Sequence, residues 1–387
     1  MKKRLAIITT HPIQYNAPLF SLLNERGNIE IMVFYTWGED VLEDKYDPGF
    51  GKTIKWDIPL LHGYPYTFVK NVSRKPGSKR FKGIDNPILI KELEAWEPDA
   101  VLIYGWSFKS HLRVMRHFKG KIPVIFRGDS TLLDQFGFAK HWARKIFLTW
   151  VYRYIDYALY VGKSNWAYFL AHGLPPHKLI RAPHTVDNNR FNKNEENVAR
   201  AGEIKKSLGI TDDMIVFLFA AKFEPKKDPV QLIKAFKQVK HPGKHLIMVG
   251  DGPLKEEMEK ERGDDHTIHF LPFQNQSQMP VTYQLGDVFV LPSLGPETWG
   301  LAVNEAMAGE LAIVVSDTCG CAEDLIKVGI NGYVFRSGNL ESLVEKLQLC
   351  ADNSGALKEM GKASKEIISD YNFEMVCLAI EQLMVKV

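Results

Sequence analysis

The sequence has few cysteines and no long apolar run. Its 387 residues include four cysteines, none of them in a Cys-x-x-Cys pair: Cys319, Cys321, Cys350 and Cys377. This distribution argues against a disulfide scaffold and a zinc site, and is typical of a protein kept reduced. No stretch approaches the roughly 18 apolar residues of a membrane span, and the apolar run at 5–8 is too short for a signal-peptide core. We therefore expect a cytoplasmic chain without a secretion signal of its own.

Several catalytic and binding motifs are also missing. There is no Gly-x-x-x-x-Gly-Lys-Ser/Thr string and no Ser-His-Asp elbow, which argues against a P-loop nucleotidase and a serine hydrolase. Nothing resembles a base-reading module, so nucleic acid is not an expected partner. No Asp-x-Asp triplet occurs, and no other pattern predicts a metal site or a bound cofactor.

Charge is distributed unevenly along the chain. Residues 1–190 carry 28 Lys+Arg against 17 Asp+Glu, whereas residues 191–387 carry 21 against 29. A basic first half and an acidic second half indicate different partners for the two halves, although a chance distribution of solubilising charge is the simpler alternative. The densest basic run comprises Lys70, Arg74, Lys75, Lys79, Arg80 and Lys82.

Short apolar runs alternate with helical periodicity, which predicts an α/β fold with parallel sheets. The first half has candidate strands at 5–9, 30–35, 100–104, 123–127, 157–161 and 179–182. The second half has them at 215–220, 245–249, 268–271, 288–291 and 312–315. A Gly-, Pro- and aromatic-rich segment at 38–83 interrupts this pattern, and long irregular insertions are usually functional or mobile.

The length and a polar stretch at 187–209 predict two domains, 1–187 and 188–370, with a final segment at 371–387. Each domain reads as a doubly wound, Rossmann-like sheet. Such sheets bind ligands at the carboxyl ends of their strands, so we expect the two domains to face a cleft.

The most informative stretch follows the candidate strand at 288–291. A Pro/Ser/Gly loop carrying Glu297 leads into a helix that begins near Gly300 and carries Glu305. The first amides of that helix suit a phosphate, and carboxylates accept hydrogen bonds from vicinal hydroxyls. The pattern therefore predicts a site for a phosphorylated sugar or nucleotide.

This Pro-Ser, Glu-x-x-Gly and Glu-Ala-Met-Ala frame resembles the retaining glycosyltransferases of family four, which have the two-domain GT-B fold and a Glu-x7-Glu motif here. The resemblance extends over most of the chain. It implies that Glu297 holds hydroxyls of the donor sugar and that Glu305 binds the ribose. The backbone of Thr298, Trp299, Gly300 and Leu301 would lie against the sugar and the diphosphate. It also implies that a helix near 373–386 crosses back to the first domain.

A second motif follows the strand at 215–220. Lys222 and Lys227 lie five residues apart in a strand-to-helix loop, where two cations would clamp a diphosphate and stabilise a leaving group. The family usually has Gly-Arg here, followed by a Lys and a Gly. Lys222 replaces the Arg, which keeps the charge without the planar fork, and Asp228 replaces the Gly.

Two further loops in the second half match the family. The Gly-Asp-Gly-Pro turn that begins at Gly250 allows close backbone approach beside a nucleotide. Phe273 falls where the family holds the base, largely through backbone groups. In the first half, His11 follows the first strand and faces the cleft or forms a helix-entry turn. Asp129 stands near the position of a family histidine that contacts the transferred sugar, whereas His184 reads as structural.

The stretch 140–154 combines aromatic residues at helical spacing with cations. A buried crossover helix accounts for it, and contact with an anionic membrane is the alternative. The basic run from Lys70 to Lys82 is the better candidate for a membrane or an anionic acceptor. Peripheral contact with the inner face of a membrane therefore stays open.

Together with the donor motifs, the resemblance implies a retaining, metal-independent hexosyltransferase that needs no cofactor. It would move a sugar from a nucleoside-diphosphate sugar to a glycan or lipid-linked acceptor in cell-surface polysaccharide synthesis. Two alternatives stay open: a nucleotide-sugar epimerase of related fold, and a non-catalytic nucleotide-sugar-binding protein. These interpretations depend on the donor motifs together with the resemblance.

Overall fold

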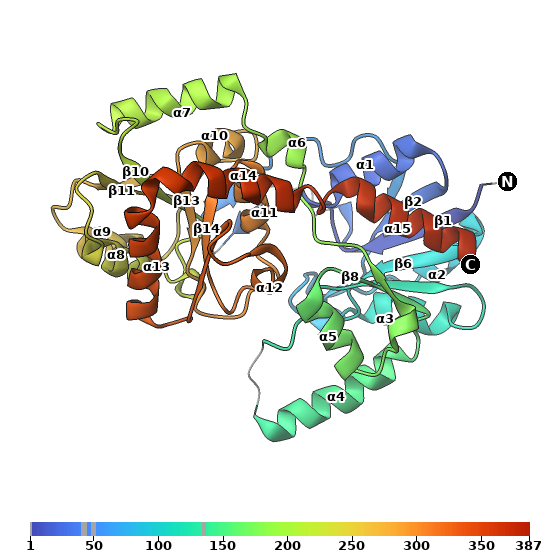
Figure 1. The fold of residues 1–387 in the computed structure, drawn as a ribbon. Coiled ribbons are helices and arrows are strands. Elements are labelled where there is room, and N and C mark those ends of the chain that lie inside the picture. Colours follow the sequence, from blue (N-terminus) through green and yellow to red (C-terminus); the bar gives the residue numbers. More distant parts are fainter. Residues whose placement is uncertain (1, 40–44, 48–51, 134–136) are drawn as a thin grey trace. The chain divides into compact units, whose positions relative to one another are not determined.

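A computed structural model describes residues 2–39, 45–47, 52–133 and 137–387. The chain divides into two compact units (Figure 1). Unit 1 comprises Met1–Asp44, Pro59–His184 and Phe373–Val387, and unit 2 comprises Lys45–Ile58 and Thr185–Asn372.

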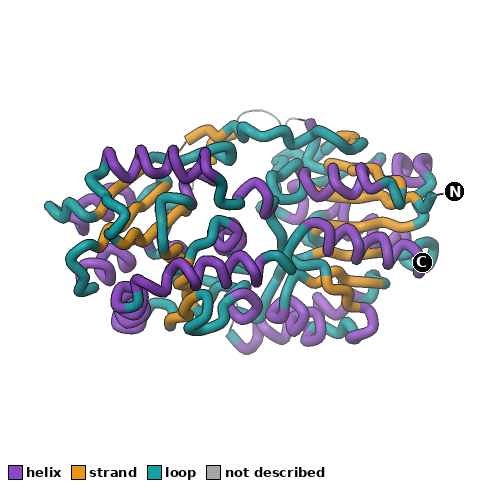
Figure 2. The backbone as a smooth tube through the Cα atoms, turned by 45° about the horizontal axis from the view of Figure 1, so that its top comes forward, coloured by secondary structure: helices purple, strands orange, loops and turns teal. Residues whose placement is uncertain are grey.

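Unit 1 is built on a parallel sheet of seven strands in the order β5-β2-β1-β6-β7-β8-β9. The central strands are almost wholly buried because helices cover both faces of the sheet; Figure 2 shows the strands as orange segments between purple helices. The strands are β1 (Arg4–Thr9), β2 (Glu30–Tyr35), β5 (Tyr66–Phe68), β6 (Ala100–Tyr104), β7 (Val124–Arg127), β8 (Tyr157–Tyr160) and β9 (Leu179–Arg181).

Two apolar clusters form the core of unit 1. One unites the sheet with α1 and α15, and the other unites it with α2, α3, α4 and α5. Because successive strand residues alternate between faces, Leu5 and Ile7 enter the first cluster, and Ala6 and Ile8 enter the second. The α-helices of unit 1 are α1 (Ala17–Arg26), α2 (Leu89–Trp96), α3 (Lys109–Phe118), α4 (Phe138–Tyr152), α5 (Lys163–Ala171) and α15 (Phe373–Lys386). The helices α6 (Asn188–Phe191) and α7 (Glu195–Ser207) are the first two of unit 2.

The C-terminal helix α15 packs beside α1 on unit 1 (Figure 1). Its buried apolar residues join the first core cluster. Arg26 fixes the pair by donating from Nε and Nη2 to the two carboxylate oxygens of the buried Glu381, at 2.8 and 2.7 Å. The helix thus completes one layer of the first unit although it comes last in the chain.

The segment Lys45–Ile58 is grouped with unit 2, although the sequence assigned it to the first domain. It holds the short antiparallel pair β3 (Lys45–Asp47) and β4 (Lys52–Ile54). The side-chain amide of Asn275 donates to the carbonyl of Lys55 at 2.7 Å, and the backbone N–H of Ser277 donates to Asp57 at 3.1 Å. These contacts explain why the segment is grouped with unit 2. No periodic pattern in the sequence predicts them.

Unit 2 repeats the architecture with six parallel strands in the order β12-β11-β10-β13-β14-β15. The strands are β10 (Ile215–Ala220), β11 (Lys244–Val249), β12 (Ile268–Leu271), β13 (Val288–Leu291), β14 (Ala312–Ser316) and β15 (Gly332–Phe335). Its remaining α-helices are α8 (Pro229–Gln238), α9 (Lys255–Arg262), α10 (Met279–Tyr283), α11 (Leu301–Ala308), α12 (Ala322–Leu325), α13 (Leu340–Asp352) and α14 (Leu357–Ile368). The expected α/β class is confirmed.

The polar stretch at 187–209 contains two helices, α6 and α7, rather than an irregular linker. Side-chain caps begin both of them. Asp187 accepts from the N–H of Arg190, and Asn194 accepts from the N–H of Asn197. Within α7 only Ala201 is buried, so the helix lacks the apolar stripe by which sequence reasoning recognises one.

Candidate functional site

The predicted donor loops of unit 2 leave neighbouring strands at one edge of its sheet. Lys222 and Lys227 follow β10, Gly250 follows β11, and Glu297 follows β13. Because β11, β10 and β13 are adjacent and parallel, their carboxyl ends lie along the same edge. The structure therefore gathers these residues at the edge where doubly wound sheets hold ligands.

Glu297 lies at the centre of a charged network. Its Oε1 accepts from Lys227 Nζ at 2.6 Å, lies 3.4 Å from Lys226 Nζ and accepts from Ser293 Oγ at 3.3 Å. The carboxylate is 12% exposed and Lys227 is 17% exposed, whereas Lys226 is 46% exposed. Charge-assisted hydrogen bonds of this kind fix the orientation of a carboxylate before any ligand arrives.

The backbone around Glu297 is held by the loop after β14. The N–H of Glu297 donates to the carbonyl of Thr318 at 3.0 Å, and the N–H of Gly320 donates to the carbonyl of Glu297 at 3.0 Å. A Cβ at Gly320 would lie only 2.1 Å from the carbonyl oxygen of Thr298, so only glycine allows this close approach. Two loops therefore position the glutamate.

The head of α11 offers free backbone donors. Gly300, the N-cap, has φ 102° and ψ 61° and no side chain to cap the helix. Within the described residues no protein group accepts a hydrogen bond from the N–H groups of Gly300, Leu301 or Ala302. All three residues are half-buried. Partly accessible amides at a helix N-terminus can accept an anion such as a phosphate.

Glu305 is buried inside unit 2. Its side chain lies within α11 at 3% exposure, and its Oε2 accepts from the hydroxyl of Tyr283 at 2.7 Å. A buried carboxylate needs such donors to offset the loss of its hydration. Glu297 and Glu305 therefore occupy different environments, the first ion-paired near the surface and the second enclosed.

The four residues from Thr298 to Leu301 differ in what they can present. Thr298 is exposed, whereas the indole of Trp299 is 2% exposed and its Nε1 donates to Asn304 Oδ1 at 2.7 Å. Trp299 also contacts the ring of Tyr371. Its side chain thus supports the loop, and only its backbone is placed to meet a ligand.

The loops after β10 and β11 are packed together. The N–H of Ala221 donates to the carbonyl of Val249 at 3.2 Å, and that of Phe223 donates to the carbonyl of Asp251 at 2.9 Å. Gly250 has φ +151°, and a Cβ there would lie 2.1 Å from the carbonyl oxygen of Ala221. Lys222, in the first of these loops, and Phe273, after β12, are both half-buried.

Asp228 shows how the chain accommodates its departure from the family pattern. It has φ 48° and ψ 47°, a left-handed conformation that glycine adopts freely and that Asp tolerates better than most residues. Burial raises the pKa of its carboxyl group. Asp228 therefore adopts a left-handed backbone conformation in which a glycine would also be unstrained.

The remaining predicted residues belong to unit 1. The Nδ1 of His11 lies 2.8 Å from Thr10 Oγ1, and its ring packs edge-on against Trp37 at 5.1 Å. Asp129 Oδ2 lies 3.7 Å from His184 Nε2. Burial lowers the pKa of His184, and Asp129 opposes that shift. His184, which the sequence assigned a structural role only, is thus the neighbour of the predicted Asp129.

Sequence reasoning missed three residues that touch the predicted glutamates. Lys226 and Ser293 contact Glu297, and Tyr283 contacts Glu305. Lys226 lies between the predicted Lys222 and Lys227, and Ser293 is the serine of the Pro-Ser loop, so their positions were a usable signal. Tyr283 lies 22 residues before Glu305 on a short helix, and nothing in the sequence pattern connects the two.

The described residues contain neither a candidate metal cluster nor a candidate membrane span. Within them no three His, Cys, Asp or Glu side chains are grouped so that they could hold a metal ion. Among the helices described, none is both long enough and apolar enough to cross a bilayer.

The second half of the chain is similar in sequence to known glycosyltransferases. Residues 201–367 match the sequence profile of glycosyl transferases group 1. Over 196 residues the chain is 26% identical to a lipopolysaccharide 1,2-N-acetylglucosaminetransferase of Salmonella typhimurium, covering 47% of this chain and 51% of the relative. It is 27% identical over 205 residues to the Escherichia coli UDP-Gal:alpha-D-GlcNAc-diphosphoundecaprenol alpha-1,3-galactosyltransferase, covering 51% of each. The chain thus spans about half the length of these curated relatives.

Solved structures match the whole chain at low sequence identity. Anabaena Alr3699/HepE in complex with UDP superimposes with a TM-score of 0.74 at 17% identity, covering 100% of both chains. The sucrose-phosphate synthase of Thermosynechococcus elongatus gives 0.74 at 16% identity, covering 100% of this chain and 99% of the other. Both units have the Rossmann-like architecture of GT-B glycosyltransferases, and that is the class of protein the chain resembles.

Proposed function

We propose that the protein is a retaining glycosyltransferase of family four that transfers a hexose from a nucleoside-diphosphate sugar to a glycan or lipid-linked acceptor. The observation that carries this proposal is the Glu297 network at the head of α11. There, two lysines, accessible amides and an oriented carboxylate follow adjacent strands of one sheet. Cations and amides suit a diphosphate, and the carboxylate suits sugar hydroxyls.

Each residue has a role in this proposal. The amides of Gly300 and Leu301 bind the diphosphate. Lys222 and Lys227 stabilise the charge that develops on it as the glycosidic bond breaks, so that no metal is required. Glu297 exchanges part of its pairing with Lys227 for hydroxyls of the donor sugar. Glu305 accepts hydrogen bonds from the ribose.

The remaining predicted residues frame the donor and the acceptor. Gly250 lets the backbone approach the nucleotide, and Phe273 lies beside the base. In unit 1, Asp129 takes the place of the family histidine that contacts the transferred sugar, His11 is a further substrate-binding residue, and the acceptor binds to that unit. The leaving diphosphate takes the acceptor proton, so no protein base is needed. A role in polysaccharide synthesis is supported by the similarity to a lipopolysaccharide N-acetylglucosaminetransferase and to a galactosyltransferase that acts on a diphosphoundecaprenol-linked sugar. Location at the inner face of the membrane is part of the proposal.

The test is turnover with the full chain and a panel of nucleoside-diphosphate sugars. Each donor is incubated with and without a glycan acceptor, and with and without EDTA. The proposal expects acceptor-dependent release of nucleoside diphosphate that survives EDTA, and a product whose anomeric configuration, read by NMR, matches the donor. Isomerised donor sugar without acceptor would indicate an epimerase instead. Donor binding without any diphosphate release would indicate a binding protein.

A further inference from the structure

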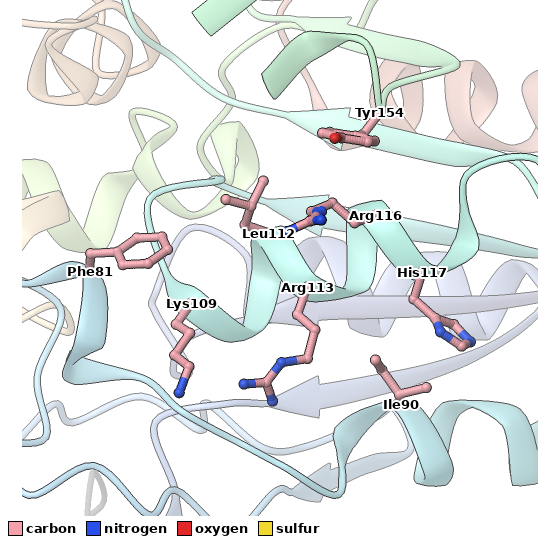
Figure 3. A pocket seen from close by; sticks show the side chains of 8 residues that line it. All are labelled: Phe81, Ile90, Lys109, Leu112, Arg113, Arg116, His117 and Tyr154. Carbon is pink, nitrogen blue, oxygen red and sulfur yellow. The ribbon is translucent and has the colours of Figure 1, made fainter. Parts of the chain in front are cut away.

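A cavity of about 590 Å³ lies in unit 1 and shares no lining residue with the donor loops of unit 2. Its volume falls within the ordinary range for small-ligand sites, about 300–1,000 Å³. Helix α3 forms its floor, with Ile90 of α2, Phe81 and Tyr154 around it (Figure 3). The remaining lining residues all come from α3: Lys109, Leu112, Arg113, Arg116 and His117.

The polar groups of this cavity are mostly cationic. Lys109, Arg113 and His117 lie four residues apart along one side of α3, and Arg116 lies on the other side towards Tyr154 (Figure 3). Asp85 pairs with both Lys109 and Arg113, the latter at 3.1 Å, and Glu94 pairs with His117 at 2.7 Å. One carboxylate is therefore shared by two cations.

Arg116 lacks an acidic partner. Among the described residues no carboxylate pairs with it; its guanidinium instead lies 6.0 Å from the ring centre of Trp150 and 5.9 Å from that of Tyr154. Positive charge thus exceeds negative charge on the cavity wall. An arginine held against aromatic rings keeps its N–H fork available for an anion.

The basic run singled out in the sequence borders the same cavity. Phe81, which is 43% exposed, lies inside that run and lines the cavity. Every cation of the run is exposed, and none forms an ion pair with another described residue: Lys70, Arg74, Lys75, Lys79, Arg80 and Lys82. The excess of positive charge therefore extends outward from the cavity over the neighbouring surface.

The lining also contains flat apolar groups. The rings of Phe81 and Tyr154 flank the cations, with Leu112 and Ile90 completing the surface. Aromatic rings pack against the apolar faces of sugar rings, and arginines bind phosphate and carboxylate bidentately. The combination matches a saccharide that bears an anionic group better than it matches a free inorganic ion.

The position of this cavity in unit 1 connects it with the proposed acceptor. Helix α3 begins five residues after β6 ends, so Lys109 lies near the carboxyl edge of the sheet, where the loops carrying His11 and Asp129 also begin. From there α3 runs ten residues, or roughly 15 Å, which is the length of a few sugar units.

We propose that this cavity binds a phosphate- or carboxylate-bearing sugar of the acceptor glycan, with Arg113 and Arg116 holding the anionic group and Phe81 and Tyr154 against the sugar ring. The proposal rests on the proposed function for the identity of the ligand as an acceptor. It makes the enzyme selective for acceptors with an acidic sugar a short distance from the growing end.

The test follows the methyl NMR signals of Ile90 and Leu112 in the full chain, because both side chains line the cavity. Glucose 6-phosphate is titrated as the charged probe and glucose as the neutral one. The proposal expects shifts of both methyl groups with glucose 6-phosphate and much weaker ones with glucose. Arg113→Gln with Arg116→Gln should weaken the binding about tenfold or more, the loss typical of charged hydrogen bonds.

Two controls keep the result specific. Lys206→Gln with Lys240→Gln removes two exposed cations elsewhere and should leave the titration unchanged. Lys222→Gln with Lys227→Gln should also leave it unchanged, so that loss of donor turnover and loss of this site are seen separately. If the double arginine variant does not fold, Arg116→Gln alone serves, since Arg116 pairs with no described carboxylate.

Three results would overturn the proposal. The methyl groups do not shift, they shift equally with glucose, or the arginine variants bind as the unchanged protein does. Binding of anionic phosphatidylglycerol vesicles is measured as well, with the unchanged protein and with the arginine variants. Arginine-dependent binding of vesicles without any glucose 6-phosphate shift would assign the surface to a lipid membrane and not to a saccharide.

Discussion

At the scale of single residues, the two glutamates of the donor motif differ in what holds them. Tyr283→Phe removes the hydroxyl that donates to Glu305 at 2.7 Å and leaves a buried carboxylate with one donor fewer. We expect the free energy of unfolding to fall by about 1.5–3 kcal/mol, the range for hydrogen bonds to charged groups. Tyr66→Phe, at a 39% exposed tyrosine, is the control. Equal stability of the two variants in urea titrations would contradict this account of Glu305.

A buried histidine gives the protein a pH dependence. His111 is fully buried, with Nδ1 2.9 Å from the carbonyl oxygen of Gly105, and burial lowers its pKa to about 4. In the unfolded chain the pKa is near 6.5, so the unfolded state takes up the proton first as the pH falls. Stability should therefore be unaffected above pH 6.5 and decline below it, by about 3 kcal/mol at pH 4.

The measurement compares urea unfolding of the unchanged protein and of His111→Gln from pH 7 to pH 4. The variant starts less stable, because the side chain also meets Thr36 at 2.9 Å, but it should lose less stability as the pH falls. Parallel pH profiles for the two proteins would show that His111 does not carry this dependence.

At the scale of elements, the close approach of two loops makes the stability of the protein unusually sensitive to substitution of Gly250. Both Gly250 and Gly329 have positive φ, 151° and 77°, but a Cβ at Gly250 would collide with the carbonyl of Ala221 whereas one at Gly329 meets nothing within 4 Å. Gly329→Ala should cost about 1–2 kcal/mol from backbone strain alone. Gly250→Ala should cost more, and it should weaken nucleotide binding. Calorimetric melting of both variants decides this, and a smaller loss at Gly250 would refute it.

The elements that sequence reasoning found are those with a strong apolar period. The strands β2, β6, β10 and β13 lie at the predicted residues because buried parallel strands are nearly continuous apolar runs. The strand β12 and the helix α11 also lie at the expected positions. By contrast, β5 at Tyr66–Phe68 and β15 at Gly332–Phe335 were not expected, because neither edge strand contains a continuous run of buried apolar residues. The charged contacts of Glu297 could be anticipated from the motif, whereas the enclosure of Glu305 by Tyr283 depends on tertiary packing.

At the scale of the whole molecule, the last helix is part of the first unit's core. Leu383 is 2% exposed in the cluster that contains β1 and α1, whereas Val385, two residues later, is 85% exposed. Leu383→Ala should destabilise unit 1 by about 2–5 kcal/mol, and Val385→Ala should have little effect. Hydrogen exchange should rise in β1 and β6 but not in β10 and β13. A uniform rise over both units, or none, would contradict the division of the chain described above.

The most direct test of the account is a crystal structure of the full chain with a nucleoside diphosphate such as UDP or GDP. We expect the diphosphate to lie at the N–H groups of Gly300, Leu301 and Ala302, with Lys222 and Lys227 within hydrogen-bonding distance and the ribose hydroxyls at Glu305. A nucleotide bound elsewhere, with the head of α11 empty, would contradict the central claim.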